Sequence, residues 1–341
     1  MNRILIEGLG GIGGVVAGKL CQAGLAPVMI TANPAITEAV REQGLQVETP
    51  EERFTARGEV YTRLRDLPAE TRFEAALLVM KATGVVEAAR ETLPWLEPQG
   101  VVVTCQNGIV EDAVAEVVGR ERVIAGIIGW GGTMHGPGRV ERTGPGAIHL
   151  GELDGRITGR VEELARILRL TGPVVVTANI RGARWAKLAI NCTITTLGAL
   201  TGQTLGEMLG SRPVRDAFLT LYREVIDTAE ALGIKLEKIA ANPGLLYLPK
   251  DAGPLKRWTK DLLARVVGRK YGKLKSSSLQ SLERGKKTEI DFLNGYVVGQ
   301  AHQAGVPVPA NEVVVRLIHE IEAGQRPIRP QNLEELLVAC R

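Results

Sequence analysis

Aromatic residues are scarce in this sequence, where Phe, Trp and Tyr make up 4% of the 341 residues. Modules that bind nucleic acids stack bases on exposed aromatic rings, so this scarcity argues against a module of that kind. The formal net charge of +4 is too small to indicate a polyanionic partner. We therefore expect a globular protein that has no nucleic-acid partner.

Cysteine and histidine are also rare, with four residues of each. The cysteines lie far apart and form no CxxC pair, which favours a reducing compartment over a disulfide-linked scaffold. They are Cys21, Cys105, Cys192 and Cys340. His135 and His149 have no ligand-like spacing to a second histidine, a cysteine or an acid, so we expect no metal site.

Long apolar runs are missing as well. No run reaches the length that a helix needs to cross a bilayer. The first residues, MNRILIEGLGG, lack the apolar stretch of a signal peptide because glycines interrupt them early. We therefore expect a cytoplasmic protein without a membrane partner, long enough for two domains with sizeable cores.

Glycine, by contrast, is abundant, with 40 residues. Its densest cluster follows the first predicted strand, residues 3–7, and precedes a helical pattern and a second strand at 27–31, all within about thirty residues. In a GxGxxG loop of this context the first glycine permits a tight turn, the second lets the backbone approach a pyrophosphate, and the third allows close helix–strand packing. The loop that we predict to bind a dinucleotide consists of Gly8, Leu9, Gly10, Gly11, Ile12 and Gly13.

The end of the second strand normally selects the cofactor, because an acid there holds the ribose hydroxyl of NAD and an arginine accommodates the phosphate of NADP. Here the sequence is Thr-Ala-Asn-Pro, with neither an acid nor an arginine. The missing acid disfavours NAD and FAD, so NADP, as NADPH, is preferred by elimination and NAD is not excluded. Thr31 and Asn33 are the candidates to hydrogen-bond a 2′-phosphate, and Arg41 lies about two helical turns further on.

Strand and helix patterns continue to alternate through the first half of the chain. We predict strands at 75–80, 101–105 and 122–128, and helices at 84–93 and 110–119. This alternation is typical of a parallel sheet with both faces covered, in which ligands bind at the carboxyl ends of the strands. Lys81 and Asn107 (within Gln-Asn-Gly) follow two such strand ends, where a ligand would bind, although each alone also fits an ordinary loop.

Residues 129–151 are rich in glycine and proline and carry short β patterns in VERT and AIHLG. We interpret these patterns as antiparallel strands that extend the sheet. A helix at 158–169 and a strand at 173–177 complete a predicted dinucleotide-binding domain of residues 1–180.

From residue 181 to 341 the helical pattern dominates, which predicts a second, helical domain. Thr288 is expected to cap the third of its main predicted helices. These helices span 181–200, 211–232, 288–304, 311–323 and 331–340. The segment 250–275 has nine Lys or Arg residues against two Asp, and we interpret it as a solvated surface helix and loop.

The helix at 181–200 carries a lysine and, four residues on, an asparagine among apolar or small residues. Residues four apart share one face of a helix, so Lys187 and Asn191 should project side by side. Such a lysine either extends to water or points into a site. Taken alone, the helix favours a lysine that extends to water.

The order of the motifs resembles the ketopantoate reductase family. The blocks GLGGIG, MKAT, QNG, WAKLAIN and SSSLQSLERGKKTEIDFLNG occur in the family's order, and residues 123–152 are similar to its middle section. The resemblance covers roughly residues 3–323. It implies a Rossmann-type domain followed by an all-α domain, with the active site in the cleft between them, and the NADPH-dependent reduction of 2-dehydropantoate to pantoate in the pathway to pantothenate and coenzyme A.

The resemblance also implies roles for individual residues. It makes Lys187 the catalytic lysine, Asn191 a substrate-binding amide, Ser277 a serine that holds substrate and Glu289 a further catalytic acid. The chemistry of the residues agrees, because hydride delivered to a ketone leaves charge on its oxygen, and an ammonium group beside that oxygen stabilises the charge and supplies a proton.

One departure concerns the substrate. Thr195 stands where the family commonly has a second asparagine, and it offers one donor rather than two. We count Thr195 among the substrate-binding residues and keep open a related reductase of another 2-oxo acid. A non-catalytic NADP-binding regulator is a further alternative. Such a protein would need none of the four residues Lys187, Asn191, Ser277 and Glu289. The expected partner is a small 2-oxo acid, a homodimer is allowed for, and the segment 324–341 is an addition without an assigned role.

Overall fold

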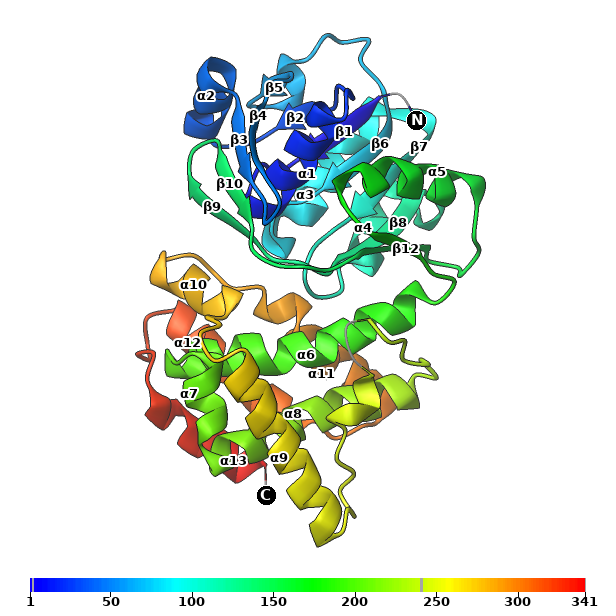
Figure 1. The fold of residues 1–341 in the computed structure, drawn as a ribbon. Helices are drawn as coiled ribbons and strands as arrows, with labels where there is room; N and C mark the ends of the chain where they lie inside the picture. Colours follow the sequence, from blue (N-terminus) through cyan, green and yellow to red (C-terminus); the bar gives the residue numbers. More distant parts are fainter. Residues whose placement is uncertain (2, 240–241, 341) are drawn as a thin grey trace. The chain divides into compact units, whose positions relative to one another are not determined.

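The computed structural model describes residues 1, 3–239 and 242–340. The chain divides into two compact units (Figure 1), one made of Met1–Gln106 with Val110–Ile180 and the other of Asn107–Ile109 with Arg181–Arg341. The described residues contain no helix long and apolar enough to cross a membrane. They also hold no group of three or more His, Cys, Asp or Glu side chains placed to bind a metal ion.

The first unit is built on an eight-stranded sheet, in the order β12-β11-β8-β7-β6-β1-β2-β5. Its strands are β1 (Ile4–Glu7), β2 (Val28–Ile30), β5 (Val60–Tyr61), β6 (Phe73–Leu78), β7 (Leu96–Thr104), β8 (Val123–Ile128), β11 (Ile148–Glu152) and β12 (Val174–Val176). All neighbours run parallel except β8 and β11. The helices of this unit are α1 (Gly11–Gln22), α2 (Pro34–Gln43), α3 (Val85–Thr92), α4 (Glu111–Val118) and α5 (Gly159–Leu168). The predicted α/β class with a parallel sheet is confirmed.

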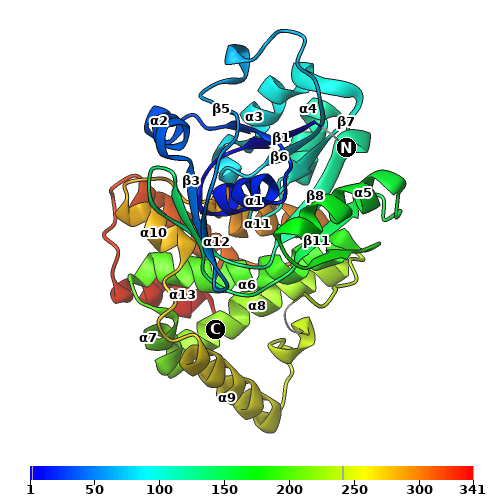
Figure 2. The same cartoon turned by 45° about the horizontal axis from the view of Figure 1, so that its top comes forward.

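A second, four-stranded sheet covers the other side of α1, as Figure 2 shows. It consists of β4 (Arg53–Ala56), β3 (Leu45–Glu48), β10 (Arg139–Arg142) and β9 (Gly132–Gly136). Our expectation that residues 129–151 extend the main sheet is therefore half wrong: β11 joins it, but the VERT strand becomes β10 and pairs with β3. The reason is apolar burial, because Val140 on β10 and Val47 on β3 are both buried in the core against α1.

Three glycines allow α1 to lie this close to the second sheet. A Cβ atom on Gly11 would lie 2.4 Å from the Gly132 carbonyl oxygen, one on Gly14 would lie 2.8 Å from Val140, and one on Gly18 would lie 2.4 Å from Val47. The three positions are spaced three and four residues apart, so they form one stripe along the helix. Larger residues there would push the second sheet away from the helix that carries the glycine-rich loop.

The second unit is helical, and its described residues form no strand. Its helices are α6 (Ile180–Thr201), α7 (Leu205–Gly210), α8 (Arg212–Ala231), α9 (Pro254–Lys270), α10 (Ser277–Glu283), α11 (Asn294–Ala304), α12 (Pro309–Glu322) and α13 (Leu333–Ala339). The predicted helices at 181–200, 211–232, 311–323 and 331–340 are confirmed as α6, α8, α12 and α13. The basic segment is confirmed as a surface helix, α9, most of whose residues are exposed.

The predicted helix at 288–304 is wrong in its first third. Residues Ile290–Phe292 form a short 3-10 turn, Leu293 leaves the helical region with φ −105° and ψ −106°, and α11 begins only at Asn294. Thr288 does not cap α11: its hydroxyl oxygen accepts the Ile290 N–H of the 3-10 turn at 3.2 Å, and its O–H donates to Glu322 at 2.7 Å. The buried amide of Asn294 donates to the Cys192 carbonyl in α6 at 3.0 Å, and this tertiary contact fixes where the helix starts.

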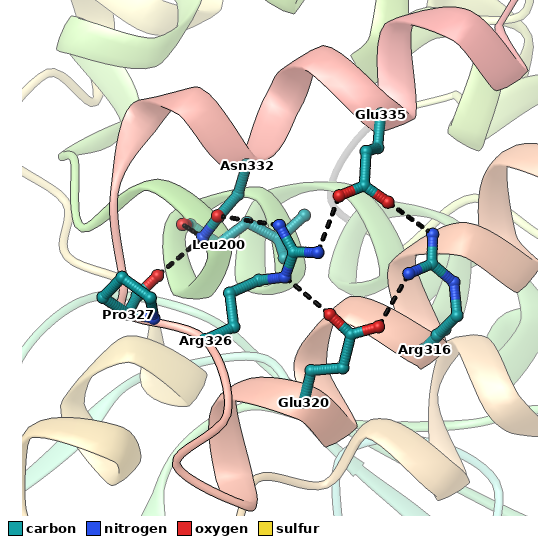
Figure 3. A network of polar contacts seen from close by, with 7 residues as sticks. All are labelled: Leu200, Arg316, Glu320, Arg326, Pro327, Asn332 and Glu335. Carbon is teal, nitrogen blue, oxygen red and sulfur yellow. Dashed lines mark hydrogen bonds and ion pairs between the residues drawn. The ribbon is translucent and has the colours of Figure 1, made fainter.

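The segment after residue 323 is tied into the second unit by a ring of charges (Figure 3). Arg316 and Arg326 each bind both Glu320 and Glu335, with N–O distances of 2.6 to 2.7 Å. Within the same segment, Asn332 donates to the Leu200 carbonyl at 2.9 Å and so satisfies the C-terminal end of α6. These contacts give the added segment a structural role that its composition does not reveal.

Candidate active site

The glycine-rich loop begins where β1 ends, and each of its glycines suits its position for a different geometric reason. Gly8 has φ +106°, in the region that disfavours side chains, and a Cβ atom there would lie 2.6 Å from the Met80 backbone nitrogen. A Cβ atom on Gly13 would lie 1.9 Å from the Gly8 carbonyl oxygen, so α1 packs directly on the loop. A Cβ atom on Gly10 would meet no described atom within 4 Å. Gly10 thus faces open space of the kind that a ligand phosphate would use.

The start of α1 adds an electrostatic preference to this open space. The first N–H groups of a helix have no acceptor within the helix, and its N-terminus carries a partial positive charge. The described first turn of α1 has no acidic residue that would offset this charge. Leu9 is buried in the core and Ile12 packs against it, so these two residues offer their backbone rather than their side chains. The loop fits the pyrophosphate of a dinucleotide.

The end of β2 is shaped by local hydrogen bonds. Thr31 is buried, and its hydroxyl oxygen accepts from the Asn33 backbone N–H at 3.4 Å. Asn33 is exposed and caps α2, with its side-chain oxygen accepting from the Ala35 N–H at 3.1 Å. The capping role explains an asparagine at this position without a ligand, so the contacts of both residues with a cofactor remain predictions.

Lys81 and Gln106 follow the carboxyl ends of β6 and β7. Lys81 is exposed and precedes a short 3-10 turn. The Gln106 side chain is buried and donates to the carbonyl oxygens of Leu78 and Met80, at 2.8 and 3.1 Å, so it joins the two strand ends. Asn107, which follows, is half-buried and belongs with the second unit. Of the Gln-Asn-Gly motif, the glutamine thus has a structural role that sequence reasoning did not assign.

Helix α6 carries the predicted catalytic lysine and two of the predicted substrate-binding residues on one face. Lys187, Asn191 and Thr195 follow one another at intervals of four residues. Lys187 is half-buried, and Thr195 is buried with its hydroxyl donating to the Asn191 carbonyl at 2.6 Å. The Asn191 side-chain nitrogen is buried and has no hydrogen-bond partner among the described residues. An unpaired buried donor costs about 1–3 kcal/mol, so it indicates a ligand acceptor that completes it.

Two distant segments of the second unit are fastened to α6 around this face. The hydroxyl of Ser276 is buried, donates to the Thr195 carbonyl at 3.0 Å and accepts from the Leu279 N–H at 3.2 Å. Ser276 is therefore the cap of α10, while Ser277, the predicted substrate residue, is exposed as the next residue along the chain. Glu289 is buried and lies directly before the 3-10 turn that leads to Asn294.

A buried polar network behind α6 was missed by sequence reasoning. Asn294 donates to Cys192 and to the Asn311 side-chain oxygen, which lies 2.8 Å away, and Asn311 donates to Glu224 at 2.7 Å. Glu224 also accepts the backbone N–H groups of Ala310 and Asn311 at the start of α12. The signal was present, since Asn294 lies in the TEIDFLNG block, but its partners lie 17 to 102 residues away in the chain.

The thiol in this region has no nucleophilic role. Complete burial raises the pKa of the Cys192 thiol well above its ordinary value, so it stays protonated at neutral pH. Lys187 on α6 and the buried Glu289, which precedes the 3-10 turn, remain the candidate titratable groups for the chemistry.

A parallel sheet with a dinucleotide loop, together with a lysine and amide face, defines a dinucleotide-dependent oxidoreductase. The chain matches the family models described as "Ketopantoate reductase PanE/ApbA" over residues 4–155 and "Ketopantoate reductase PanE/ApbA C terminal" over residues 179–322. It belongs to the ketopantoate reductase family, and it is an enzyme that acts on a CH–OH group.

Relatives and solved structures agree over most of the chain. A 2-dehydropantoate 2-reductase of Archaeoglobus fulgidus is 28% identical over 325 residues, covering 95% of this chain and 99% of the relative. A ketopantoate reductase structure from Ralstonia eutropha JMP134 has a TM-score of 0.80 at 28% identity, covering 95% of this chain and 99% of that one. D-mandelate dehydrogenase with NADH and anilino(oxo)acetate also reaches a TM-score of 0.80, with 95% and 99% covered, but at 20% identity this likeness shows the fold alone.

Proposed function

We propose that this protein reduces 2-dehydropantoate to pantoate with NADPH, in the cytoplasm and in the pathway to pantothenate and coenzyme A. The observation that carries the proposal is the buried, unpaired amide of Asn191 one helical turn from Lys187. A regulator that only bound a dinucleotide would have no use for this pair. Family membership and the similarity to named 2-dehydropantoate 2-reductases support the choice of substrate.

The nicotinamide, when bound, supplies a hydride to the carbonyl carbon of the 2-oxo acid. We assign the cofactor to the loop of Gly8, Gly10 and Gly13, with its remaining contacts at Thr31, Asn33, Lys81 and Asn107. The ammonium group of Lys187 stabilises the charge that develops on the carbonyl oxygen and donates the proton that completes the alcohol. Partial burial of this lysine strengthens both effects, since water screens the charge less.

Three further residues hold the substrate in this proposal. The Asn191 amide donates to a substrate oxygen and so satisfies its unpaired N–H group. Since the Thr195 hydroxyl already donates to the backbone, its oxygen faces a substrate as an acceptor only, which suits a substrate hydroxyl better than a carboxylate. We assign the carboxylate to Ser277, and the orientation of Lys187 or of a substrate hydroxyl to Glu289.

Thr195 favours a second candidate, a reductase of a different 2-oxo acid. A threonine fills less space than an asparagine, and the only donor of Thr195 is already used by the Asn191 carbonyl, so the pocket beside Asn191 would accept a bulkier or less polar substituent. A panel of 2-oxo acids separates the candidates by kcat/KM, because substrates that differ in one hydrogen bond to a buried group differ strongly in this ratio.

The test begins with initial rates on 2-dehydropantoate, with NADPH and NADH side by side. We expect NADPH-dependent turnover, and we expect Lys187→Ala to lower kcat by about 10²- to 10⁴-fold while the Kd for NADPH stays unchanged. Lys256→Ala, which changes an exposed lysine of α9, is the matched control and should keep full activity. Normal turnover by the Lys187 variant would refute the mechanism, and absence of turnover with every 2-oxo acid would favour the regulator.

A homodimer is part of the proposal. Helix α9 leaves several large apolar side chains exposed, among them Leu255 at 75% and Trp258 at 61%. Exposed apolar surface of this kind commonly marks an interface. Light scattering of the purified protein measures the mass directly, and a monomer at all concentrations would remove this part of the proposal.

A further inference from the structure

The sheet extends beyond β2 by one more strand, which the sequence did not predict. Strand β5 runs parallel to β2, with Met29 level with Val60 and Ile30 level with Tyr61. The register continues past both strands, since the Thr31 N–H donates to the Tyr61 carbonyl at 3.1 Å. Neighbouring strands lie about 4.8 Å apart, so the residues that follow β5 border the residues that follow β2.

Arginine occupies this border. Arg63 is exposed and follows β5 by two residues, alongside the Ala32–Asn33 turn that follows β2. Arg41 reaches the same strand from α2, where its Nε and Nη2 donate to the Val60 carbonyl at 3.1 and 2.9 Å and its guanidinium lies 6.0 Å from the centre of the Tyr61 ring. The carboxyl end of β2 thus has two arginines near it, although its own sequence contains none.

Neither guanidinium is neutralised. Across the described ranges 1, 3–239 and 242–340, no carboxylate lies within ion-pair distance of Arg41 or Arg63. The acid nearest to Arg63 along the chain, Asp66, accepts the backbone N–H of Arg63 at 3.1 Å. Glu59 lies at the other end of β5 and contacts the Tyr61 hydroxyl at 3.5 Å. The positive charge is therefore available to an anionic ligand.

The location of these arginines, at the carboxyl end of β2, indicates which anionic group they would bind. A dinucleotide whose pyrophosphate rests on the β1–α1 loop places its adenosine ribose at the carboxyl end of the next strand, β2. NADP differs from NAD by a phosphate on the 2′ oxygen of that ribose, and an arginine fork binds phosphate through paired charge-assisted hydrogen bonds. We propose that Arg63, supported by the positive charge of Arg41, binds the 2′-phosphate and gives this enzyme its preference for NADPH.

This inference rests on the proposed function, because it names the residue behind the proposed cofactor. The test measures Kd by isothermal titration for NADPH, NADH and adenosine 2′,5′-bisphosphate, with no substrate present. We expect Arg63→Ala to raise the Kd for NADPH and for the bisphosphate about tenfold or more, and to leave the Kd for NADH unchanged. Arg57→Ala is the matched control, since Arg57 is equally exposed but precedes β5, at the opposite end of the strand.

The outcomes separate the two proposals. If the unaltered protein binds neither dinucleotide or prefers NADH, the proposed cofactor is wrong. If it prefers NADPH and Arg63→Ala keeps that preference, the cofactor stands and the role of Arg63 is refuted. Arg63→Glu should weaken NADPH binding further than Arg63→Ala, because it places a negative charge beside the phosphate. An equal loss for NADH in either variant would indicate a general disturbance and would also refute the role.

Discussion

At the scale of single residues, Asn191 is a position where a group suited to substrate binding lowers the stability of the folded protein. Its side-chain nitrogen is buried and unpaired in the described protein, so the folded chain carries a cost that a substrate oxygen would remove. Groups that bind ligands are often suboptimal for the protein that carries them. This gives a test of the site that does not depend on knowing the substrate.

We predict that Asn191→Leu raises the stability of the protein while it destroys substrate binding. Leucine has a similar size and no donor to leave unpaired, so the free energy of unfolding should rise by about 1 kcal/mol. Denaturant unfolding measures this change, and KM for 2-dehydropantoate should rise at the same time. A loss of stability would mean that the amide makes a contact in the folded protein, and Asn191 would then lose its place in the substrate site.

Glu7, the last residue of β1, makes stability depend on pH. Burial raises its pKa from 4.5 to about 7, while a hydrogen bond from the Thr92 hydroxyl at 2.8 Å opposes the shift and the charge of Glu91 adds to it. The folded state therefore holds a proton that the unfolded state releases. This stabilisation is fully present below pH 4.5 and is lost as pH rises through 7.

We predict that Glu7→Gln removes most of this loss. The pKa shift of Glu7 corresponds to a decrease of about 3 kcal/mol in the free energy of unfolding between pH 4.5 and pH 8. Glutamine keeps an oxygen for Thr92 and has no charge, so the variant should be more stable than the unaltered protein at pH 8 and similar to it at pH 5. Thermal unfolding at both pH values provides the measurement, and parallel curves for the two proteins would contradict the assignment.

At the scale of elements, local patterns were predictable and distant pairings were not. The β1–loop–α1–β2 unit follows from glycine spacing and apolar runs that lie within 30 residues of one another. The second sheet was missed because β3 finds its partner β10 more than 90 residues later, and nothing in either strand names the other. The break at Leu293 was missed for the same reason, since Asn294 is held by groups on α6 and α12.

The residues of the candidate site also separate into those that local sequence predicts and those that only distant contacts reveal. Lys187 and Asn191 share a helix face, which spacing alone predicts, and the resemblance supplied Ser277 and Glu289 from distant positions. Ser276, whose hydroxyl joins α10 to α6, and Arg63 beside β2 could be assigned only from strand and helix pairing in three dimensions.

Two glycines of the loop on α1 should respond differently to the same small change. Gly13→Ala places a methyl group against the Gly8 carbonyl and should cost about 1–3 kcal/mol or more of stability. Gly10→Ala meets no described atom and should leave stability almost unchanged, but its methyl group occupies the space that we assign to the pyrophosphate. Paired measurements of Tm and of the Kd for NADPH test this, and NADPH binding at full strength by Gly10→Ala would place the pyrophosphate elsewhere.

At the scale of the whole molecule, the two units have separate apolar cores. The core of the first unit lies between the two sheets and their helices, and those of the second unit surround α6 and α8. A substitution should therefore lower the stability of the unit that contains it. This expectation can be tested with one variant in each unit.

We predict two thermal transitions that respond separately. Gly13→Ala should lower the transition that saturating NADPH raises, by about 2.7 kcal/mol at a hundred times Kd. Asn332→Ala leaves the Leu200 carbonyl without its side-chain partner and should lower the other transition. Differential scanning calorimetry distinguishes the cases, and a single transition shifted by both variants would show that the units unfold as one.

The link from Asn332 to Leu200 also has a consequence for the order of synthesis. Helix α6 is synthesised before the segment that follows residue 323. The Leu200 carbonyl near its end accepts from the Arg329 N–H and from Asn332, which lies 132 residues further along the chain. Until then the nascent helical unit lacks α13 and the Arg–Glu ring, and it exposes the apolar surface that Leu333 and Leu336 later cover. We therefore expect a newly synthesised chain to expose this apolar surface to chaperones until the segment 324–340 docks, whereas the first unit can already be folded.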